Sequence, residues 1–159
     1  MNRVVIQDYS APQLPCRFQL DLTSTQAEHC TGCWSCWIKT PGNCVYSDLN
    51  DFYRAYLAAD EVVIFTKTSQ EFISSSLKTL FDRMLPLFLP YITYRTGESM
   101  HLPRYEAYPD IRVFYEGDFS SEANRRIYEE YLHRTFYQFY SKNSIVQPIS
   151  QFALEGAAL

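Results

Sequence analysis

The apolar run Val62-Val63-Ile64-Phe65 constrains the fold more than any other stretch of the chain. A strand whose two faces are both apolar has to be covered on both sides, as in a parallel sheet with helices on each face. Ile111–Tyr115 predicts a further strand, and Val4–Ile6 begins a short strand that ends near Tyr9. Phe18–Leu22 alternates apolar and polar residues, which is the period of a strand. Ile145–Phe152 predicts the last strand.

Helical patterns lie between these strands. Ser47 or Asp48 can cap a helix that runs to Leu57, and Ser74 to Ser76 offer caps for the next helix. A third helix begins after Ser120 or Ser121, and Pro86 and Pro90 end or kink the second. Three residue sets predict the inward faces: Phe52, Tyr53, Tyr56 and Leu57; Leu77, Leu80, Phe81 and Met84–Leu85; and Ile127, Tyr131, Leu132, Thr135 and Phe139.

Strands thus alternate with helices from Phe18 onward, which predicts parallel βαβ units in a doubly wound, three-layer α/β sheet. We expect one domain over residues 1–159. Only Ser10–Cys16 separates the first two strands, whereas a parallel crossover needs a dozen or more residues. We therefore expect these two strands to pair antiparallel, or one of them not to be a strand. Thr93–Pro109 is predicted as a long irregular loop.

Charge and hydropathy exclude some classes of function. The formal net charge is −4 and no run of Lys or Arg is present, which argues against nucleic acid as a partner. The longest apolar stretch, Met84–Ile92, is short and interrupted by prolines, so we expect no membrane span. The first residues turn polar by Gln7-Asp8, too early for a signal peptide, and we expect a cytoplasmic protein.

Four cysteines, Cys30, Cys33, Cys36 and Cys44, follow the spacing C-x2-C-x2-C-x7-C. Close spacing of this kind suits the four thiolate ligands of a [4Fe–4S] cluster. Zinc is a second option, although structural zinc more often uses two separated C-x2-C pairs. A third interpretation is a loop of reduced thiols whose shape is fixed by the packing of its tryptophans. The spacing leaves these three interpretations open.

One known family matches four segments of the chain in the same order: Cys30–Cys44, Ala59–Phe65, Ser74–Arg83 and Gly97–Pro109. These segments resemble the flavodoxin-like NADPH-dependent FMN reductase family, and the cysteine loop also resembles that of iron–sulfur flavoproteins. The resemblance implies FMN as cofactor, NAD(P)H as co-substrate, and a homo-oligomer or a pairing with a related flavoprotein. In the family, the first strand leads into a helix whose N-terminus holds the FMN phosphate. Here Ser10–Cys16 stands in that place, so the first helix is expected to be missing.

In doubly wound sheets, ligands bind outside the carboxyl ends of the strands. The residues expected to bind the cofactor are Ser10, Trp37, Thr66, Lys67, Thr68, Ser69, Phe72 and Gly117. The cysteine loop follows the second strand, which would place Trp37 at the same end of the sheet. After the central strand the family tends to have Pro and an aromatic residue, whereas this chain has Lys67 and Ser69.

The sequence names no catalytic acid or base. For His101 and Arg104 a structural role is favoured over catalysis, and Lys78 with Asp82–Arg83 predicts a surface or interface network. We expect an FMN-binding oxidoreductase that uses NAD(P)H to reduce flavin, quinone or another small acceptor. One alternative is a flavin-poor relative that acts as a subunit or interaction module. The other is an iron–sulfur flavoprotein that carries electrons.

Overall fold

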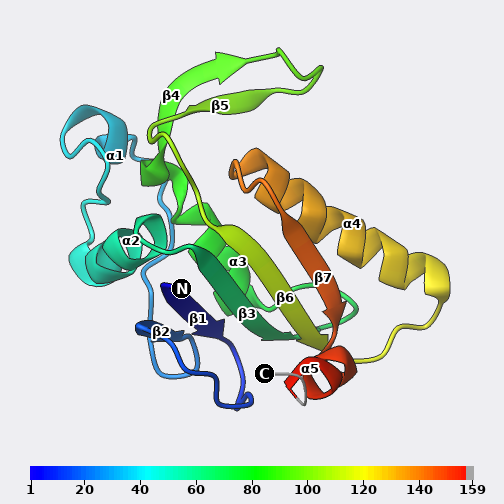
Figure 1. Cartoon of the computed structure of the whole chain (residues 1–159). Helices are drawn as coiled ribbons and strands as arrows, with labels where there is room; N and C mark the ends of the chain where they lie inside the picture. The colour runs from blue at the N-terminus through cyan, green and yellow to red at the C-terminus, as the bar shows by residue number, and fades with distance from the viewer. Residues whose placement is uncertain (157–159) are drawn as a thin grey trace.

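The computed structural model describes residues 1–156 of the chain (Figure 1). Its central sheet contains β1 (Arg3–Gln7), β2 (Phe18–Asp21), β3 (Glu61–Lys67), β6 (Asp110–Glu116) and β7 (Ser144–Pro148). The strands lie in the order β2-β1-β3-β6-β7, and every neighbouring pair is parallel. This is the strand order of the flavodoxin-like doubly wound fold. The predicted α/β fold class is therefore confirmed.

Three helices cover one face of the sheet: α2 (Asn50–Leu57), α3 (Ser75–Asp82) and α4 (Glu122–Gln138). The sequence signals for the starts of α3 and α4 are confirmed. The Ser74 hydroxyl accepts a hydrogen bond of 3.1 Å from the backbone N–H of Leu77, and Ser121 caps α4 in the same way. A short 3-10 turn, η1 (Ser47–Leu49), leads into α2. These caps satisfy backbone donors that the first turn of a helix leaves free.

The buried stripe of α4 agrees with the prediction at Leu132 and differs from it at Ile127. Ile127 is 63% exposed, and the fully buried side chains are Tyr128, Leu132 and Phe136. These three follow one another at four-residue spacing, so they share a face of the helix. Tyr128 packs edge-on against Tyr115 of β6. The helix therefore turns Tyr128 toward the core and the neighbouring Ile127 away from it.

The second face of the sheet has a different cover. Its buried side chains are Val5, Val63, Phe65 and Phe114. Residues 8–17 lie over them in an irregular conformation, together with α5 (Ile149–Gly156). Phe152 of α5 meets the rings of Phe65 and Phe114 edge-on, each at 5.0 Å between centroids. The predicted strand Ile145–Phe152 is thus correct only as far as Pro148, since proline offers no N–H to continue the ladder.

The pairing of β1 with β2 also corrects an expectation. The two strands are parallel, with Val4 opposite Phe18 and Ile6 opposite Leu20. Residues 8–17 connect them without a helix in this described part of the chain. An extended chain covers about 3.3 Å per residue, so this segment can span roughly 30 Å, whereas a five-residue strand measures about 17 Å. The minimum of a dozen residues applies to a connection that includes a helix. Here the extended segment itself covers the sheet.

Residues 88–103 form a hairpin, so Thr93–Pro109, which was expected to be a long irregular loop, contains a strand. The 3-10 turn η2 (Leu85–Leu87) leads into β4 (Phe88–Thr93), which pairs antiparallel with β5 (Met100–Pro103). Pro86 lies in η2, after the end of α3, as expected. Pro90 lies within β4, where the register shifts between Phe88 and Ile92. In Figure 1 this hairpin stands at the top of the molecule, apart from the central sheet. Within residues 1–156, no helix combines the length and the apolar character needed to cross a membrane.

Candidate functional site

The carboxyl ends of β1, β3 and β6 meet at one edge of the sheet, at the bottom of Figure 1. The loops that follow these strands are joined by backbone hydrogen bonds. The N–H of Thr68 donates to the carbonyl of Glu116 at 2.8 Å, and the N–H of Asp8 donates to the carbonyl of Phe65 at 3.1 Å. The strand order reverses between β1 and β3, which is where doubly wound folds bind ligands. We call this region the carboxyl edge.

Asp8 is the central charge of the carboxyl edge. Its carboxylate accepts hydrogen bonds from the Thr66 hydroxyl at 2.7 Å, the Lys67 N–H at 2.8 Å and the Ser74 hydroxyl at 2.5 Å. The carboxylate therefore ties β1 to β3 and to the start of α3. Thr66 is fully buried, and its hydroxyl is engaged by this bond. Asp8 was not among the site residues expected from the sequence, although a carboxylate directly after the first strand was a signal that could have identified it.

A tight turn shapes the loop after β3. Ser69 and Phe72 exchange two backbone hydrogen bonds, and Gln70 and Glu71 between them both have positive φ. The Glu71 carboxylate accepts hydrogen bonds from the Ser120 N–H and the Asn124 amide, each at 2.5 Å. The bonds from Ser120, followed by that from Asn124, lower the pKa of Glu71. The turn is thus fastened to the start of α4 and presents the half-exposed ring of Phe72, which packs on Tyr131.

Gly117 lies directly against this loop. A Cβ atom at Gly117 would lie 1.8 Å from the hydroxyl oxygen of Thr68, and its φ is +148°. Only glycine fits such a close approach of the two loops. The side chain of Lys67 points to Glu116, with 3.6 Å between charged atoms, and both residues are largely exposed. Ser10, two residues after Asp8, is exposed.

Tyr9 places an unsatisfied group at the carboxyl edge. Within residues 1–156, the hydroxyl of Tyr9 is buried and has no hydrogen-bond partner. Burial, followed by the charges of Glu116 and Asp8, raises the pKa of Tyr9 to about 12. A neutral phenol next to two carboxylates remains a hydrogen-bond donor at physiological pH.

Trp37 lies at the opposite end of the sheet from the other expected cofactor residues. Its indole N–H donates to the carbonyl of Phe88 in β4 at 3.0 Å, and its ring contacts that of His101. α1 (Ser35–Ile38) contacts η2, beyond the end of α3. The start of α3, by contrast, binds Asp8 through Ser74. The expectation that the cysteine loop shares the carboxyl edge is therefore corrected.

The chain between β2 and α1 explains this placement. The segment from Leu22 to His29 lies beside the first turns of α3, and Thr79 shares a hydrogen bond with His29. The Glu28 carbonyl then accepts a hydrogen bond from Arg83 at the end of α3. The chain thus follows α3 from the carboxyl edge to the other end of the sheet.

The four loop cysteines line one small pocket of about 80 Å³. Cys30 and Cys33 are exposed, whereas Cys36 and Cys44 are half-buried. Hydrogen bonds from Ser35, followed by one from Thr31, lower the pKa of the Cys33 thiol. Burial, followed by the charges of the other three thiols, raises the pKa of Cys36. No group of three His, Cys, Asp or Glu side chains in the described chain is arranged to hold a metal ion. As arranged, the thiols do not fit a metal site.

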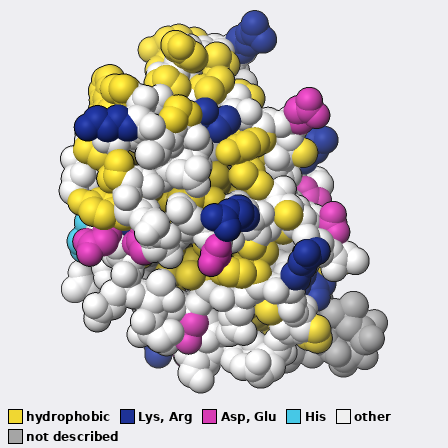
Figure 2. Space-filling view, turned by 90° about the vertical axis from the view of Figure 1, so that its left-hand side faces the viewer, with side chains coloured by type: hydrophobic (Ala, Val, Ile, Leu, Met, Phe, Trp, Pro, Cys, Tyr) yellow, Lys and Arg dark blue, Asp and Glu magenta, His cyan; other side chains and the backbone are white. Residues whose placement is uncertain are grey.

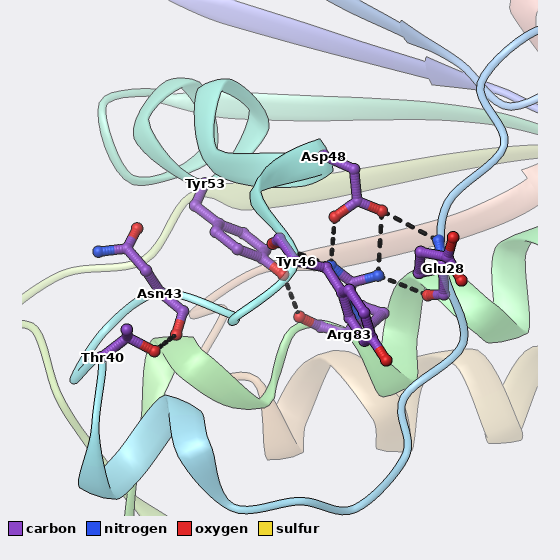
Figure 3. A network of polar contacts seen from close by, with 7 residues as sticks. All are labelled: Glu28, Thr40, Asn43, Tyr46, Asp48, Tyr53 and Arg83. Atoms are coloured by element: carbon purple, nitrogen blue, oxygen red, sulfur yellow. Dashed lines mark hydrogen bonds and ion pairs between the residues drawn. The ribbon is translucent and has the colours of Figure 1, made fainter.

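Arg83 forms a buried polar network behind this pocket (Figure 3). Its side chain is 1% exposed, which corrects the expectation of a surface network for this residue. The guanidinium donates to both carboxylate oxygens of Asp48, at 2.5 and 3.1 Å, and to the Glu28 carbonyl. The Tyr53 hydroxyl donates to the Arg83 carbonyl at 2.6 Å. Lys78 and Asp82, in contrast, form a half-exposed pair as expected.

His101 and Arg104 make structural contacts with the hairpin and η2. A ring nitrogen of His101 lies 2.9 Å from the carbonyl of Leu89. Arg104 donates to the carbonyls of Pro86 and Phe88, at 3.0 and 3.3 Å. These bonds hold β4 and β5 in place, in keeping with the structural role that was favoured for both residues.

Comparison with proteins of known structure identifies the fold of the chain. No family model matches the chain, and no curated protein matches its sequence. An azoreductase from Bacillus anthracis str. Sterne aligns with a TM-score of 0.62 and 13% identity, over 99% of this chain and 92% of that one. The azoreductase AzrA aligns with a TM-score of 0.62 and 12% identity, over the same shares. An FMN-dependent NADH-azoreductase from Bacillus anthracis str. Ames Ancestor, in complex with FMN, aligns with a TM-score of 0.52 and 13% identity, over 94% and 88%. These similarities establish a shared flavodoxin-like fold.

Proposed function

We propose that the chain is an FMN-binding oxidoreductase that uses NADH or NADPH to reduce a small acceptor at the carboxyl edge. The observation that carries this proposal is the meeting of the loops after β1, β3 and β6 at the point where the strand order reverses. A structural neighbour with the same fold is an FMN-dependent NADH-azoreductase in complex with FMN. FMN supplies the hydride chemistry when it is bound, and the protein supplies binding and orientation.

The residues of the carboxyl edge fit the ring of FMN. Thr68 and Ser69 offer hydroxyl groups to the polar edge of the ring, and Gly117 lets the backbone approach closely. Phe72 is 41% exposed and offers an apolar surface for packing. The buried hydroxyl of Tyr9, which lacks a partner among the described residues, is a donor that a ligand would satisfy.

The phosphate of FMN would be held differently from the usual arrangement. No helix lies between β1 and β2 in the described chain, so the helix N-terminus that often binds a phosphate is absent there. We propose that Lys67 and Ser10 hold the phosphate instead. The exposed pair of Lys67 with Glu116 stabilises the fold by less than about 1 kcal/mol, so Lys67 is free to turn toward an anion. The carboxylate of Asp8 repels that anion, and we expect a modest affinity for FMN.

The test is a titration of the purified chain with FMN, followed by fluorescence, and an assay of NADH and NADPH oxidation with a quinone, free flavin or an azo dye as acceptor. We expect binding at micromolar FMN and oxidation only with FMN present. Gly117→Ala should abolish both, because its Cβ would collide with Thr68. Ile127→Ala, an exposed change on α4, should leave both intact. A colourless protein that binds no FMN at high micromolar concentration contradicts the proposal.

A second candidate function is that of a flavin-poor subunit, and the position of Asp8 favours it. The carboxylate already takes the Lys67 N–H and the hydroxyls of Thr66 and Ser74, which an anion would otherwise use. In that case the apolar surface at the other end of the molecule would be the surface that binds a partner. Its exposed side chains are Trp34, Ile38, Tyr91, Ile92 and Tyr94. Figure 2 shows hydrophobic side chains over the upper part of that face.

For this second function we propose another copy of the chain as the partner at that surface. β4 and β5 form a two-stranded sheet, and an isolated pair of strands is marginally stable in water. Packing of the exposed Tyr91, Ile92 and Tyr94 side chains of two copies about a twofold axis would be self-complementary, as a twofold interface requires. Light scattering should give a dimer mass that falls to the monomer mass in a Tyr91→Ser/Tyr94→Ser variant. A monomeric wild-type chain contradicts this arrangement.

A further inference from the structure

We propose that the cysteine loop is a thiol–disulfide exchange site, in which Cys33 reacts with a small-molecule disulfide and Cys36 completes the exchange. The site lies at the other end of the sheet from the carboxyl edge, so it is separate from the proposed flavin chemistry. Its geometric basis is that the loop cysteines line one pocket and differ in exposure.

The backbone of the loop turns twice within a few residues. Gly32 and Trp34 both have positive φ, of 63° and 60°. For a residue with a side chain this conformation costs about 1 kcal/mol, so the contacts of the loop must hold it. Trp34 packs edge-on against Trp37, whose indole is bonded to Phe88. The turns bring cysteines that are three residues apart to the wall of the same pocket.

Exposure divides the roles between the two cysteines. Cys33 is exposed, so a dissolved disulfide can reach its sulfur. Cys36 is half-buried in the pocket. Large molecules reach its sulfur poorly there, but the sulfur of a neighbouring cysteine can reach it. The spacing C-x2-C is short enough for an internal disulfide, and such pairs serve in thiol exchange in other folds. The pocket thus separates an entry thiol from a resolving thiol.

Arg83 supplies positive charge to the wall of this pocket. Its side chain lines the pocket and is 1% exposed, and the carboxylate of Asp48 fixes its position. Its Nε–H is buried and has no acceptor among the described residues. A guanidinium keeps its proton at any physiological pH, so the wall of the pocket carries a permanent cation, whose charge acts on the Cys44 thiol.

Disulfide exchange also fits the arrangement better than metal binding does. A metal ion needs at least three converging ligands, and the described residues provide no such group. A disulfide needs only two sulfur atoms whose Cα atoms lie within about 7 Å of each other, and Cys33 and Cys36 are three residues apart on the wall of one pocket.

The proposed exchange has two steps, in which atoms and electrons balance. The thiolate of Cys33, whose proton has passed to solvent, attacks one sulfur of a disulfide RSSR. A bond forms from Cys33 to that sulfur, the S–S bond of RSSR breaks, and the thiolate that leaves takes up a proton to give RSH. The thiolate of Cys36 then attacks the Cys33 sulfur and releases the second RSH. Two protein thiols are oxidised to one disulfide, and RSSR is reduced to two thiols.

The experiment uses the full chain and glutathione disulfide as the probe. Anaerobically purified protein is equilibrated with mixtures of glutathione and its disulfide, the free thiols are alkylated, and the peptides are identified by mass spectrometry. We expect a peptide in which Cys33 and Cys36 are joined. Cys36→Ser should trap glutathione on Cys33, and Cys33→Ser should slow the loss of loop thiols about tenfold. Cys16→Ser, outside the loop, should change neither result.

Three results would overturn the proposal. One is mixed disulfides on all loop cysteines without an internal bond. Another is a reaction at Cys33 no faster than at Cys16. The third is stoichiometric iron or zinc that is retained on purification and protects the loop thiols. These readouts need neither FMN nor NADH, so their outcome is independent of the proposed oxidoreductase activity.

Discussion

Asp48 binds Arg83 through two hydrogen bonds, to Nη2 at 2.5 Å and to Nη1 at 3.1 Å, and the arginine side chain is 1% exposed. The same carboxylate accepts a hydrogen bond from the backbone N–H of Glu28. One residue of η1 thus holds together the end of α3 and the segment that leads into the cysteine loop. Substitution of Asp48 would leave a cation inside the protein without its counter-ion.

Asp48→Ala should lower the free energy of unfolding by about 3 kcal/mol, since breaking a buried pair leaves its partner charge uncompensated. Urea unfolding followed by circular dichroism measures the change. Asp51→Ala is the matched control, because Asp51 pairs with Arg54 at the surface, where both side chains are more than 70% exposed. That change should cost less than about 1 kcal/mol. Equal losses for the two variants would contradict a structural role for the buried pair.

Stability should fall at acid pH partly through Asp48. Partial burial raises its pKa, but hydrogen bonds from Arg83 and from the Glu28 N–H outweigh this, and the net pKa is lowered. As the pH falls, Asp48 of the unfolded chain, with an ordinary Asp pKa of about 3.9, binds a proton before Asp48 of the folded chain does. The stabilisation is therefore complete above that pKa and is lost as the pH falls through the lower pKa of the folded state. Unfolding free energies of the wild type and Asp48→Asn should begin to converge below about pH 4 and should meet only below the lower pKa of the folded state.

Asp8→Asn should strengthen FMN binding about tenfold while leaving riboflavin binding unchanged. The substitution removes a negative charge near the proposed phosphate position and keeps a side-chain oxygen that can accept hydrogen bonds. Fluorescence titration with both ligands separates the effect on the phosphate from any effect on the ring. An equal change for FMN and riboflavin would show that Asp8 does not face the phosphate.

Leu132→Ala should destabilise the chain by about 3 kcal/mol, because the leucine is fully buried between α4 and the sheet. Ile127→Ala should change stability by no more than about 0.5 kcal/mol, since that side chain is 63% exposed. Thermal or urea unfolding of both variants checks the observed orientation of α4. A reversed order of the two effects would mean that the helix presents its other stripe to the sheet.

The central sheet and the helix starts could be predicted from the sequence because their signals are local. The apolar run before Thr66 forms the strand that its sequence predicts, and Ser74 and Ser121 cap the helices that follow them, as predicted. The parallel pairing of β1 with β2 could not be predicted, since it depends on an extended segment covering the sheet in place of a helix. Ile127 was misjudged because it and Tyr128 are adjacent apolar residues, and the sequence does not say which of the two faces the sheet.

The candidate site was predictable only in part. The rule that ligands bind after strands located Thr68, Ser69 and Gly117 correctly at one edge. The position of Trp37 depends on how an irregular segment runs along α3, and no periodicity or turn signal reports that path. Asp8 looked like an ordinary polar residue at the end of a strand, and its importance arises from three donors that come from distant parts of the chain.

The interior position of β1 in the sheet has a consequence for synthesis. β1 is made before its neighbour β3, which lies 58 residues later, as the pair Arg3 and Glu61 shows. Until β3 emerges, β1 has only β2 as a neighbour from the sheet, and two strands alone are marginally stable. This part of the nascent chain therefore stays open to chaperones and proteases until β3 has been made.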